Sequence, residues 1–233
     1  DSYNTAVGFN AGTAVTTGTV NTIIGGLAGD ALTVGNSNTV VGYGALTTDT
    51  KGDRNVAIGV SALEQQNFTT STDSVNTAVG YACGQSITTG TFNTLVGGNT
   101  GDALADAHFN TAIGLQALTT DTEGNYSTAV GYRALATQNL TTSTNTYNVA
   151  VGADAGLSIT TGTINTIVGG LAGDALTVGN SNVVVGYQAL GGDTAGDRNV
   201  AIGVQALLDQ NFTTTTDAYN IGVGYHAGTN IAT

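Results

Sequence analysis

The sequence predicts an all-β fold, a single parallel β-solenoid in which short coils stack along one axis. Three observations predict it: a short motif recurs along the whole chain at a spacing of 17 or 21, one motif position is always Gly, and the position before it is always Val or Ile. Repeats of this length are too short for helical hairpin units, which need more than about 30 residues. We therefore expect one continuous solenoid of thirteen coils over residues 1–233, with the last coil partial.

The motif in its first copy is Asn-Thr-Ala-Val-Gly, residues 4–8, followed by two variable residues and Ala11. Successive copies begin at steps of 17, 17, 17 and 21, and this pattern recurs, so the larger period is 72, the step from Asn4 to Asn76. The chain is thus a three-fold tandem of a four-coil unit plus a partial coil. The motif begins at Asn4, Asn21, Asn38, Asn55, Asn76, Asn93, Asn110, Ser127, Asn148, Asn165, Asn182, Asn199 and Asn220.

The motif indicates a short strand that ends at a corner. We number its positions from the residue after Asn, so that Thr5 is position 1 and Gly8 is position 4. The β-branched residues at position 3 favour a strand, and the fixed Gly indicates a tight corner. The Asn residues are expected to form a ladder from coil to coil, which Ser127 should weaken locally.

The two faces of this strand are both apolar. Because side chains alternate along a strand, we expect positions 1 and 3 to face the interior and position 2 to face outward. A strand that is apolar on both faces is covered on both faces. Three copies around an axis would cover the outer column, so we expect a homotrimer. The alternative is a monomer that exposes a mildly apolar ribbon. The predicted trimer interface comprises Ala6, Ile23, Val40, Ala57, Ala78, Leu95, Ala112, Ala129, Ala150, Ile167, Val184 and Ala201.

Composition argues against several classes of function. The net charge is −12 with only four basic residues, which argues against a nucleic-acid partner or an anionic membrane surface. No apolar run approaches the roughly 20 residues that span a bilayer, so we expect no membrane insertion. The two histidines, His108 and His226, share no repeat position, and no phosphate-binding loop is present. We expect no enzyme activity and no cofactor, and a buried side chain for the single cysteine, Cys83.

Acidic residues recur in columns of the repeat. Asp49, Asp53, Asp193 and Asp197 are the candidate ligands for Ca²⁺, which takes six to eight oxygens. The alternative is that these side chains cap turns by accepting hydrogen bonds from nearby backbone. We favour the turn-capping interpretation and predict no metal site.

Every fourth coil carries a four-residue, Thr-rich insertion, within residues 66–73, 138–145 and 210–217. Loops on a rigid scaffold are common binding elements. One interpretation is that the apolar residue of each loop folds back over the coil; the other is a receptor contact. The contact residues would be Phe68, Thr69, Thr70, Leu140, Thr141, Phe212 and Thr213. The tyrosines that follow a corner Gly, such as Tyr43 and Tyr81, are expected to pack on the neighbouring coil; the alternative is that they are exposed and stack on sugars.

Residues 4–11, followed by Thr16-Thr17-Gly18, resemble the repeats of bacteriophage tail-fibre proteins that precede endosialidase-type chaperone domains. Residues 55–59 and 199–203 also resemble the Val-Ala-Ile-Gly core of trimeric autotransporter adhesin heads, which are left-handed β-rolls. The coils here are longer than the adhesin repeat, which favours the tail-fibre family. No initiator Met or signal peptide is present, so we expect a segment of a longer chain.

The resemblance implies a rigid, trimeric spacer or host-attachment segment of a virion tail fibre, with a host cell-surface glycan or protein as partner. A bacterial surface adhesin or extracellular filament is the alternative. An ice-binding solenoid fits less well, because the column Thr17, Val34, Lys51 interrupts the regular Thr array that such proteins present.

Overall fold

The computed structural model describes residues 2–231, and all regular structure in this part of the chain is β. The chain divides into two compact units, residues 1–110 and 111–233. Each unit is a parallel β-solenoid, which confirms the predicted fold class. That one continuous solenoid extends over residues 1–233 remains a prediction, as does the handedness of the roll.

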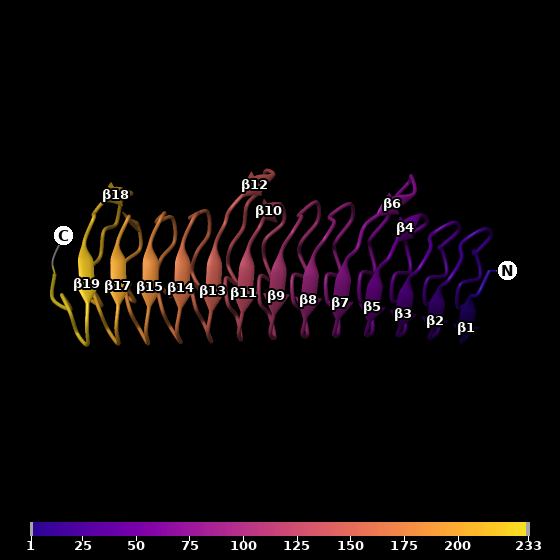
Figure 1. Ribbon diagram of the computed structural model, residues 1–233, viewed down its shortest axis with the longest axis horizontal. Coiled ribbons are helices and arrows are strands. Elements are labelled where there is room, and N and C mark those ends of the chain that lie inside the picture. The colour runs from indigo at the N-terminus through magenta and orange to yellow at the C-terminus, as the bar shows by residue number, and fades with distance from the viewer. Residues whose placement is uncertain (1, 232–233) are drawn as a thin grey trace. The chain divides into compact units, whose positions relative to one another are not determined.

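Each coil contributes one three-residue strand, and the strands of neighbouring coils pair in parallel and in register (Figure 1). The first unit contains β1 (Thr5–Val7), β2 (Thr22–Ile24), β3 (Thr39–Val41), β5 (Val56–Ile58), β7 (Thr77–Val79) and β8 (Thr94–Val96). The second contains β9 (Thr111–Ile113), β11 (Thr128–Val130), β13 (Val149–Val151), β14 (Thr166–Val168), β15 (Val183–Val185), β17 (Val200–Ile202) and β19 (Ile221–Val223). Because register is kept, each repeat position forms a column.

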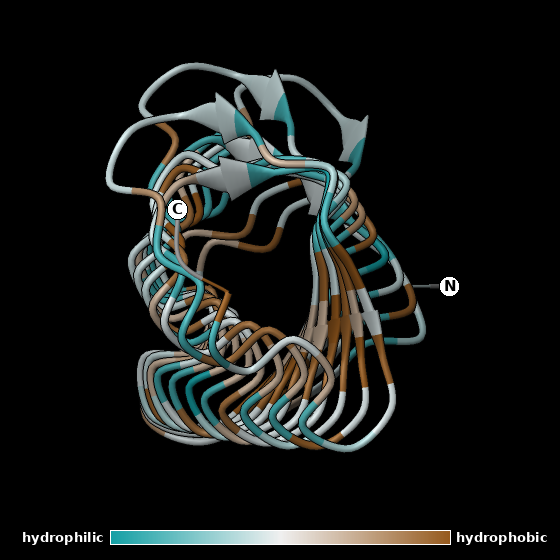
Figure 2. Cartoon of the chain, turned by 90° about the vertical axis from the view of Figure 1, so that its left-hand side faces the viewer, coloured by the Kyte–Doolittle hydropathy of each residue, from teal (hydrophilic) through white to brown (hydrophobic). Residues whose placement is uncertain are grey.

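The insertions form small parallel pairs of short strands. These are β4 (Gly52–Asp53) with β6 (Thr72–Asp73), β10 (Gly124–Asn125) with β12 (Thr144–Asn145), and β16 (Gly196–Asp197) with β18 (Thr216–Asp217). Figure 2 shows that each insertion loop extends beyond the neighbouring coils of its own unit. The insertions therefore protrude.

The corner Gly is required by both backbone conformation and space. Gly25 has φ of 138°, a region that L side chains rarely adopt. A Cβ atom there would also collide with the carbonyl oxygen of Gly42 in the next coil. Since the same position recurs in every coil, the glycines allow the coils to approach to the spacing of paired strands.

The predicted orientation of the strand was wrong. Position 2 faces the interior, with an exposed fraction of 1% or less from Ile23 onward. Positions 1 and 3 face outward, as the burial of Thr22, Ile23 and Ile24 shows. The residues predicted as a trimer interface therefore lie inside the coils: Ile23, Val40, Ala57, Ala78, Leu95, Ala112, Ala129, Ala150, Ile167, Val184 and Ala201. Ala6, in the first coil, belongs to the same column and is exposed.

Complementary side-chain volumes decide which face is inside. Where position 2 is large, as at Ile23, the residue six positions later is Gly29, and a Cβ there would lie 3.5 Å from Cδ1 of Ile23. Where position 2 is Ala57, the corresponding residue is the fully buried Leu63. In these two coils one large residue fills this part of the core, as close packing requires. Where both positions are small, as at Ala78 and Gly84, other side chains fill the space instead. These are Ile87, and Leu63 and Leu95 in the neighbouring coils.

A ladder of buried asparagines connects the coils, as predicted. The Asn38 Oδ1 atom accepts hydrogen bonds from the backbone N–H of Asn55 (2.8 Å) and from its Nδ2 (3.1 Å). The Asn38 Nδ2 group donates to the Gly52 carbonyl (3.0 Å). At Ser127 the pattern changes, because its hydroxyl pairs with that of Thr146 at 2.6 Å. The buried amides of the ladder thus find partners in the following coil.

Candidate interaction surfaces

The outward side of the strands forms an apolar surface. Position 1 is Thr, Val or Ile and position 3 is Val or Ile, and many of these side chains are at least one-third exposed, including Ile24, Ile113 and Ile202. We define the sheet face as the outward positions 1 and 3 together with the residue that precedes each ladder Asn. The strand is therefore apolar on both faces, as predicted, but with the two faces exchanged.

The residue before each ladder Asn has an unusual conformation. Val20 and Ile164 have φ of 60° and 61°, a region that β-branched residues rarely occupy. Both side chains are more than half exposed, so burial does not explain their size. Aromatic residues in this column stack along the coils: the Phe92 and Phe109 rings lie 5.1 Å apart, and the Tyr126 and Tyr147 rings 5.3 Å apart.

Exposed apolar side chains and charges are separated on the surface. Every exposed large hydrophobic residue of the described chain lies on the sheet face or directly after a corner Gly. The acidic residues of the described chain lie elsewhere, and within residues 2–231 the only charged residues of the sheet face are Arg54 and Arg198. Each Arg is paired with a loop carboxylate, Arg54 with Asp73 at 2.6 Å and Arg198 with Asp217. The sheet face therefore carries no uncompensated charge.

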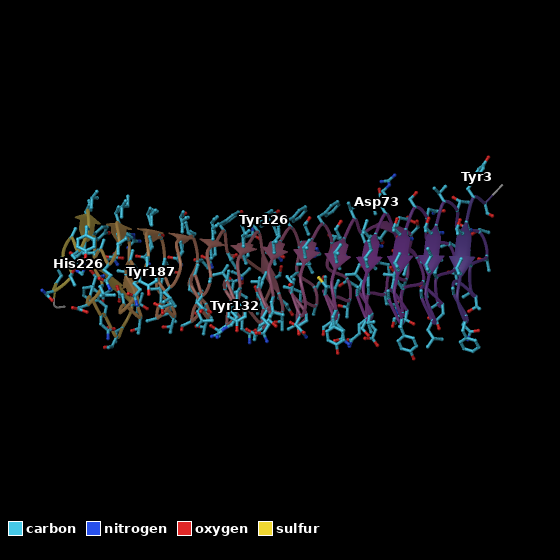
Figure 3. All side chains as sticks on the ribbon, turned by 90° about the horizontal axis from the view of Figure 1, so that it is seen from below. Tyr3, Asp73, Tyr126, Tyr132, Tyr187 and His226 are labelled. Atoms are coloured by element: carbon cyan, nitrogen blue, oxygen red, sulfur yellow. The ribbon has the colours of Figure 1, made fainter. Side chains whose placement is uncertain are left out.

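The tyrosines after the corner glycines are largely exposed. Tyr43 packs on the neighbouring coil at Gly26, as predicted, yet Tyr43 is 61% and Tyr81 64% exposed. Figure 3 shows Tyr126 and Tyr132, which precede and follow β11, on opposite edges of the second unit. The residues after the corner glycines thus form a second surface, separate from the sheet face.

The insertion loops offer polar rather than apolar contacts. Phe68 and Leu140 are 6% and 7% exposed, and Phe212 is half-buried, so these residues fold back over the coil. The suggestion that Phe68 and Leu140 contact a receptor is therefore wrong. Thr69, Thr70, Thr141 and Thr213 are exposed, and their role as contacts remains a prediction.

The calcium candidates are engaged with N–H donors. The Asp49 Oδ1 atom accepts hydrogen bonds from the backbone N–H of Lys51 (3.2 Å), Gly52 (3.0 Å) and Phe68 (3.1 Å). Asp193 accepts the same kind of bonds from Gly196 (3.1 Å) and the loop residue Phe212 (3.0 Å). These carboxylates cap turns, as the favoured interpretation predicted.

Asp53 and Asp197 are buried and belong to a second ladder of hydrogen bonds between the coils. Each accepts a hydrogen bond of 2.6 Å from the backbone N–H of the Asn one coil earlier, Asn36 or Asn180. Donors thus occupy oxygens that a cation would need. Among residues 2–231, no group of three His, Cys, Asp or Glu side chains is placed to hold a metal ion.

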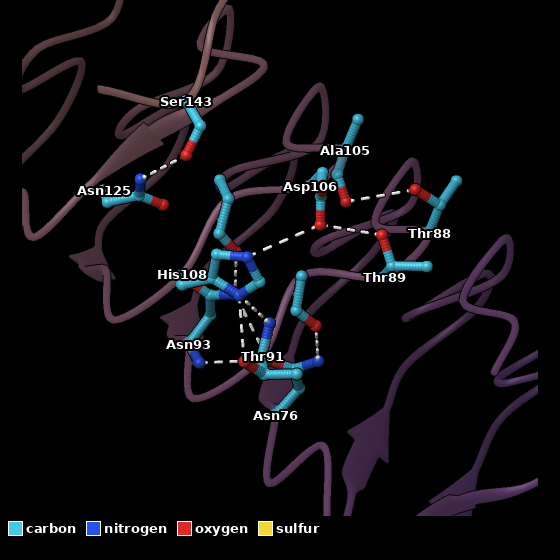
Figure 4. A network of polar contacts seen from close by, with 12 residues as sticks. Asn76, Thr88, Thr89, Thr91, Asn93, Ala105, Asp106, His108, Asn125 and Ser143 are labelled. Carbon is cyan, nitrogen blue, oxygen red and sulfur yellow. Dashed lines mark hydrogen bonds and ion pairs between the residues drawn. The ribbon is translucent and has the colours of Figure 1, made fainter. Parts of the chain in front are cut away.

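The remaining candidates for chemistry have structural partners. His108 takes the place of Asn36 in the second ladder of the first unit, and its Nδ1 atom accepts a hydrogen bond from the Thr91 backbone N–H at 3.0 Å (Figure 4). Cys83 is buried, as predicted, and burial raises the pKa of its thiol to about 12. In the described residues, no helix is long and apolar enough to cross a membrane.

Comparison with known proteins adds no relative: no protein-family model, no curated protein and no solved structure matches this chain. The fold and these surfaces therefore carry the functional argument.

Proposed function

We propose that this chain is a structural segment of an extracellular attachment fibre, of the phage tail-fibre type, in which copies associate through the sheet face into a homotrimer. The observation that carries the proposal is the separation of exposed apolar residues from the acidic residues. On a protein of net charge −12, a largely apolar surface whose arginines are paired with carboxylates is suited to contact with another copy of itself.

The strained column before each ladder Asn supports the same proposal. Val20 and Ile164 hold positive φ values that Gly or Asn would adopt more easily. Neither side chain fills the core of its own coil. Large apolar residues at such positions are accounted for if their side chains are buried against a partner.

The rigidity of such a segment follows from its hydrogen bonds. Backbone pairing and the Asn ladder both connect each coil to the next, and stability in stacked repeats is a sum of coil and interface terms. A bacterial surface adhesin built from the same coils is the alternative. The genomic neighbourhood would distinguish the two. A tail fibre is encoded among tail genes, whereas an adhesin is encoded together with a membrane-anchor domain.

The test is the mass of the protein in solution, measured by light scattering, before and after heating in detergent. We expect the mass of three chains, and we expect the three chains to remain associated in detergent before heating. A Val41→Asp variant should lower the mass to that of one chain while circular dichroism still reports β structure. Thr69→Asp, in an exposed insertion loop, is the matched control and should leave the mass unchanged. A single-chain mass for the unmodified protein would overturn the proposal.

A further inference from the structure

The residues that follow the corner glycines form a regular row of aromatic rings in the first unit. Phe9, Tyr43 and Tyr81 are 76%, 61% and 64% exposed. They occupy the first, third and fifth coils, and the coils between them carry Gly26 and Val60 at the same position. We call Phe9, Tyr43 and Tyr81 the aromatic ridge. Since paired strands are about 4.8 Å apart, the rings recur at about 9.6 Å along the coils.

The ring of Tyr43 lies against the backbone of the preceding coil. A Cβ atom on Gly26 would be 3.4 Å from Cδ2 and 3.8 Å from Cε2 of Tyr43. The absence of a side chain at Gly26 lets the ring rest on that coil, while most of its surface remains open to solvent. The arrangement recurs in the second unit, where a Cβ on Gly170 would be 3.8 Å from Cδ2 of Tyr187. Such a ring is held in place without being buried.

The residues that follow the ridge positions along the chain are uncharged. The residues next along the chain are Asn10, Gly44 and Ala82, and Ser61 follows Val60 between the second and third rings. These positions offer an amide and a hydroxyl beside the rings and no charged group. The ridge therefore suits a neutral ligand that presents C–H groups to a ring face, which is the electron-rich side of an aromatic ring.

We propose that the aromatic ridge binds an extended neutral polysaccharide, whose alternate sugar rings stack on Phe9, Tyr43 and Tyr81. In a β-1,4-linked chain, every second sugar presents the same face, and that repeat is close to two strand spacings. Sugar hydroxyls would then lie beside Asn10 and Ser61. This inference rests on the proposed attachment function and deepens it by naming a ligand class, but it concerns a surface outside the sheet face.

Binding to microcrystalline cellulose and to chitin, with cellohexaose and chitohexaose as soluble competitors, tests the proposal. We expect the unmodified protein to bind at least one of these solids and to be released by the matching hexaose. Tyr43→Ala should weaken binding about tenfold, because it removes the central stacking contact. Tyr43→Phe keeps the ring and should bind like the unmodified protein.

The matched control is Thr142→Ala, at an exposed position of an insertion loop outside both the sheet face and the ridge, which should leave polysaccharide binding unchanged. Equal losses for Thr142→Ala and Tyr43→Ala would overturn the proposal, as would failure to bind either solid. Light scattering of the same samples reports association separately. Failure of the unmodified protein to bind, at the mass of three chains, would therefore contradict the ridge proposal only. A single-chain mass would contradict the proposed trimeric fibre only.

Discussion

The Nε2 group of Gln66 donates a 2.6 Å hydrogen bond to Oδ2 of Asp49, one coil earlier, and both side chains are fully buried. The Oε1 atom of Gln66 in turn accepts from Nδ2 of the ladder residue Asn76 at 2.8 Å. With three backbone N–H groups on Oδ1, Asp49 is the acceptor at the end of a chain of buried donors. The network connects the base of the first insertion to the Asn ladder.

Replacing Asp49 with Asn should destabilise the protein. In one orientation the NH₂ group of the new amide would face the backbone N–H donors, and in the other it would face the NH₂ group of Gln66. If the Gln66 amide rotated to accept from the new amide, the Gln66 NH₂ group would face the NH₂ group of Asn76. One unsatisfied buried group costs about 1–3 kcal/mol. Urea unfolding followed by circular dichroism measures the change. Asp209→Asn, at a position outside this buried network, is the control and should change the free energy of unfolding by less than about 0.5 kcal/mol.

Asp174 makes stability depend on pH. Burial, and to a lesser degree the negative charge of Asp154, raise the pKa of Asp174 above its ordinary value of 3.8. The folded state therefore binds this proton more tightly than the unfolded state. The stabilising contribution is complete below the ordinary pKa and is lost as pH rises through the raised pKa. Relative to Asp174→Asn, the unmodified protein should lose stability as the pH rises from the ordinary pKa of 3.8 through the raised pKa of Asp174. A constant difference across that range would contradict this expectation.

Two adjacent residues of β8 should respond oppositely to the same substitution. Leu95 is fully buried in the coil, whereas Val96 points outward from the same strand. A buried, unpaired carboxylate is strongly unfavourable, so Leu95→Asp should abolish the β-sheet signal in circular dichroism. Val96→Asp should retain that signal. Loss of the signal in the second variant and not the first would restore the orientation that we predicted from the sequence.

Cys83 should be unreactive in the folded protein. Because its thiol is buried and its pKa is raised to about 12, almost no thiolate is present at mildly alkaline pH. A thiol reagent such as dithionitrobenzoate should therefore report no free thiol until urea unfolds the chain. Introducing a cysteine at the exposed Thr69 provides the control, since one equivalent should then react without denaturant. Rapid modification of Cys83 in the native protein would show that its coil opens.

The sequence was sufficient to predict the coil, its corner and its turn caps. Three local features each have a direct physical reason: the spacing of the motif, the fixed Gly exemplified by Gly25, and the recurring Asp49 column. In the structure Gly25 has the positive φ of a corner, and Asp49 caps a turn. The fold class can be predicted from these local features because they recur along the chain, so that successive coils adopt the same conformation and stack.

The strand orientation could not be obtained from alternation alone. Period two separates the faces of a strand, but it does not say which is inside when both are apolar. The deciding signal was longer in range: Ile23 is matched by Gly29, and Ala57 by Leu63, which identifies position 2 as part of the core. The sheet face was misjudged for the same reason, since its residues have the hydrophobic character of a core.

The Asn ladder has a consequence for how this gene can change. The ladder amides are completed by the coil that follows, and coils at the same place in successive four-coil blocks present nearly the same acceptors. Recombination between two copies of the block would therefore join compatible coils, and each buried ladder amide at the junction would keep its hydrogen-bond partners. Descendants of this sequence can gain or lose length in whole blocks while each intermediate remains able to fold.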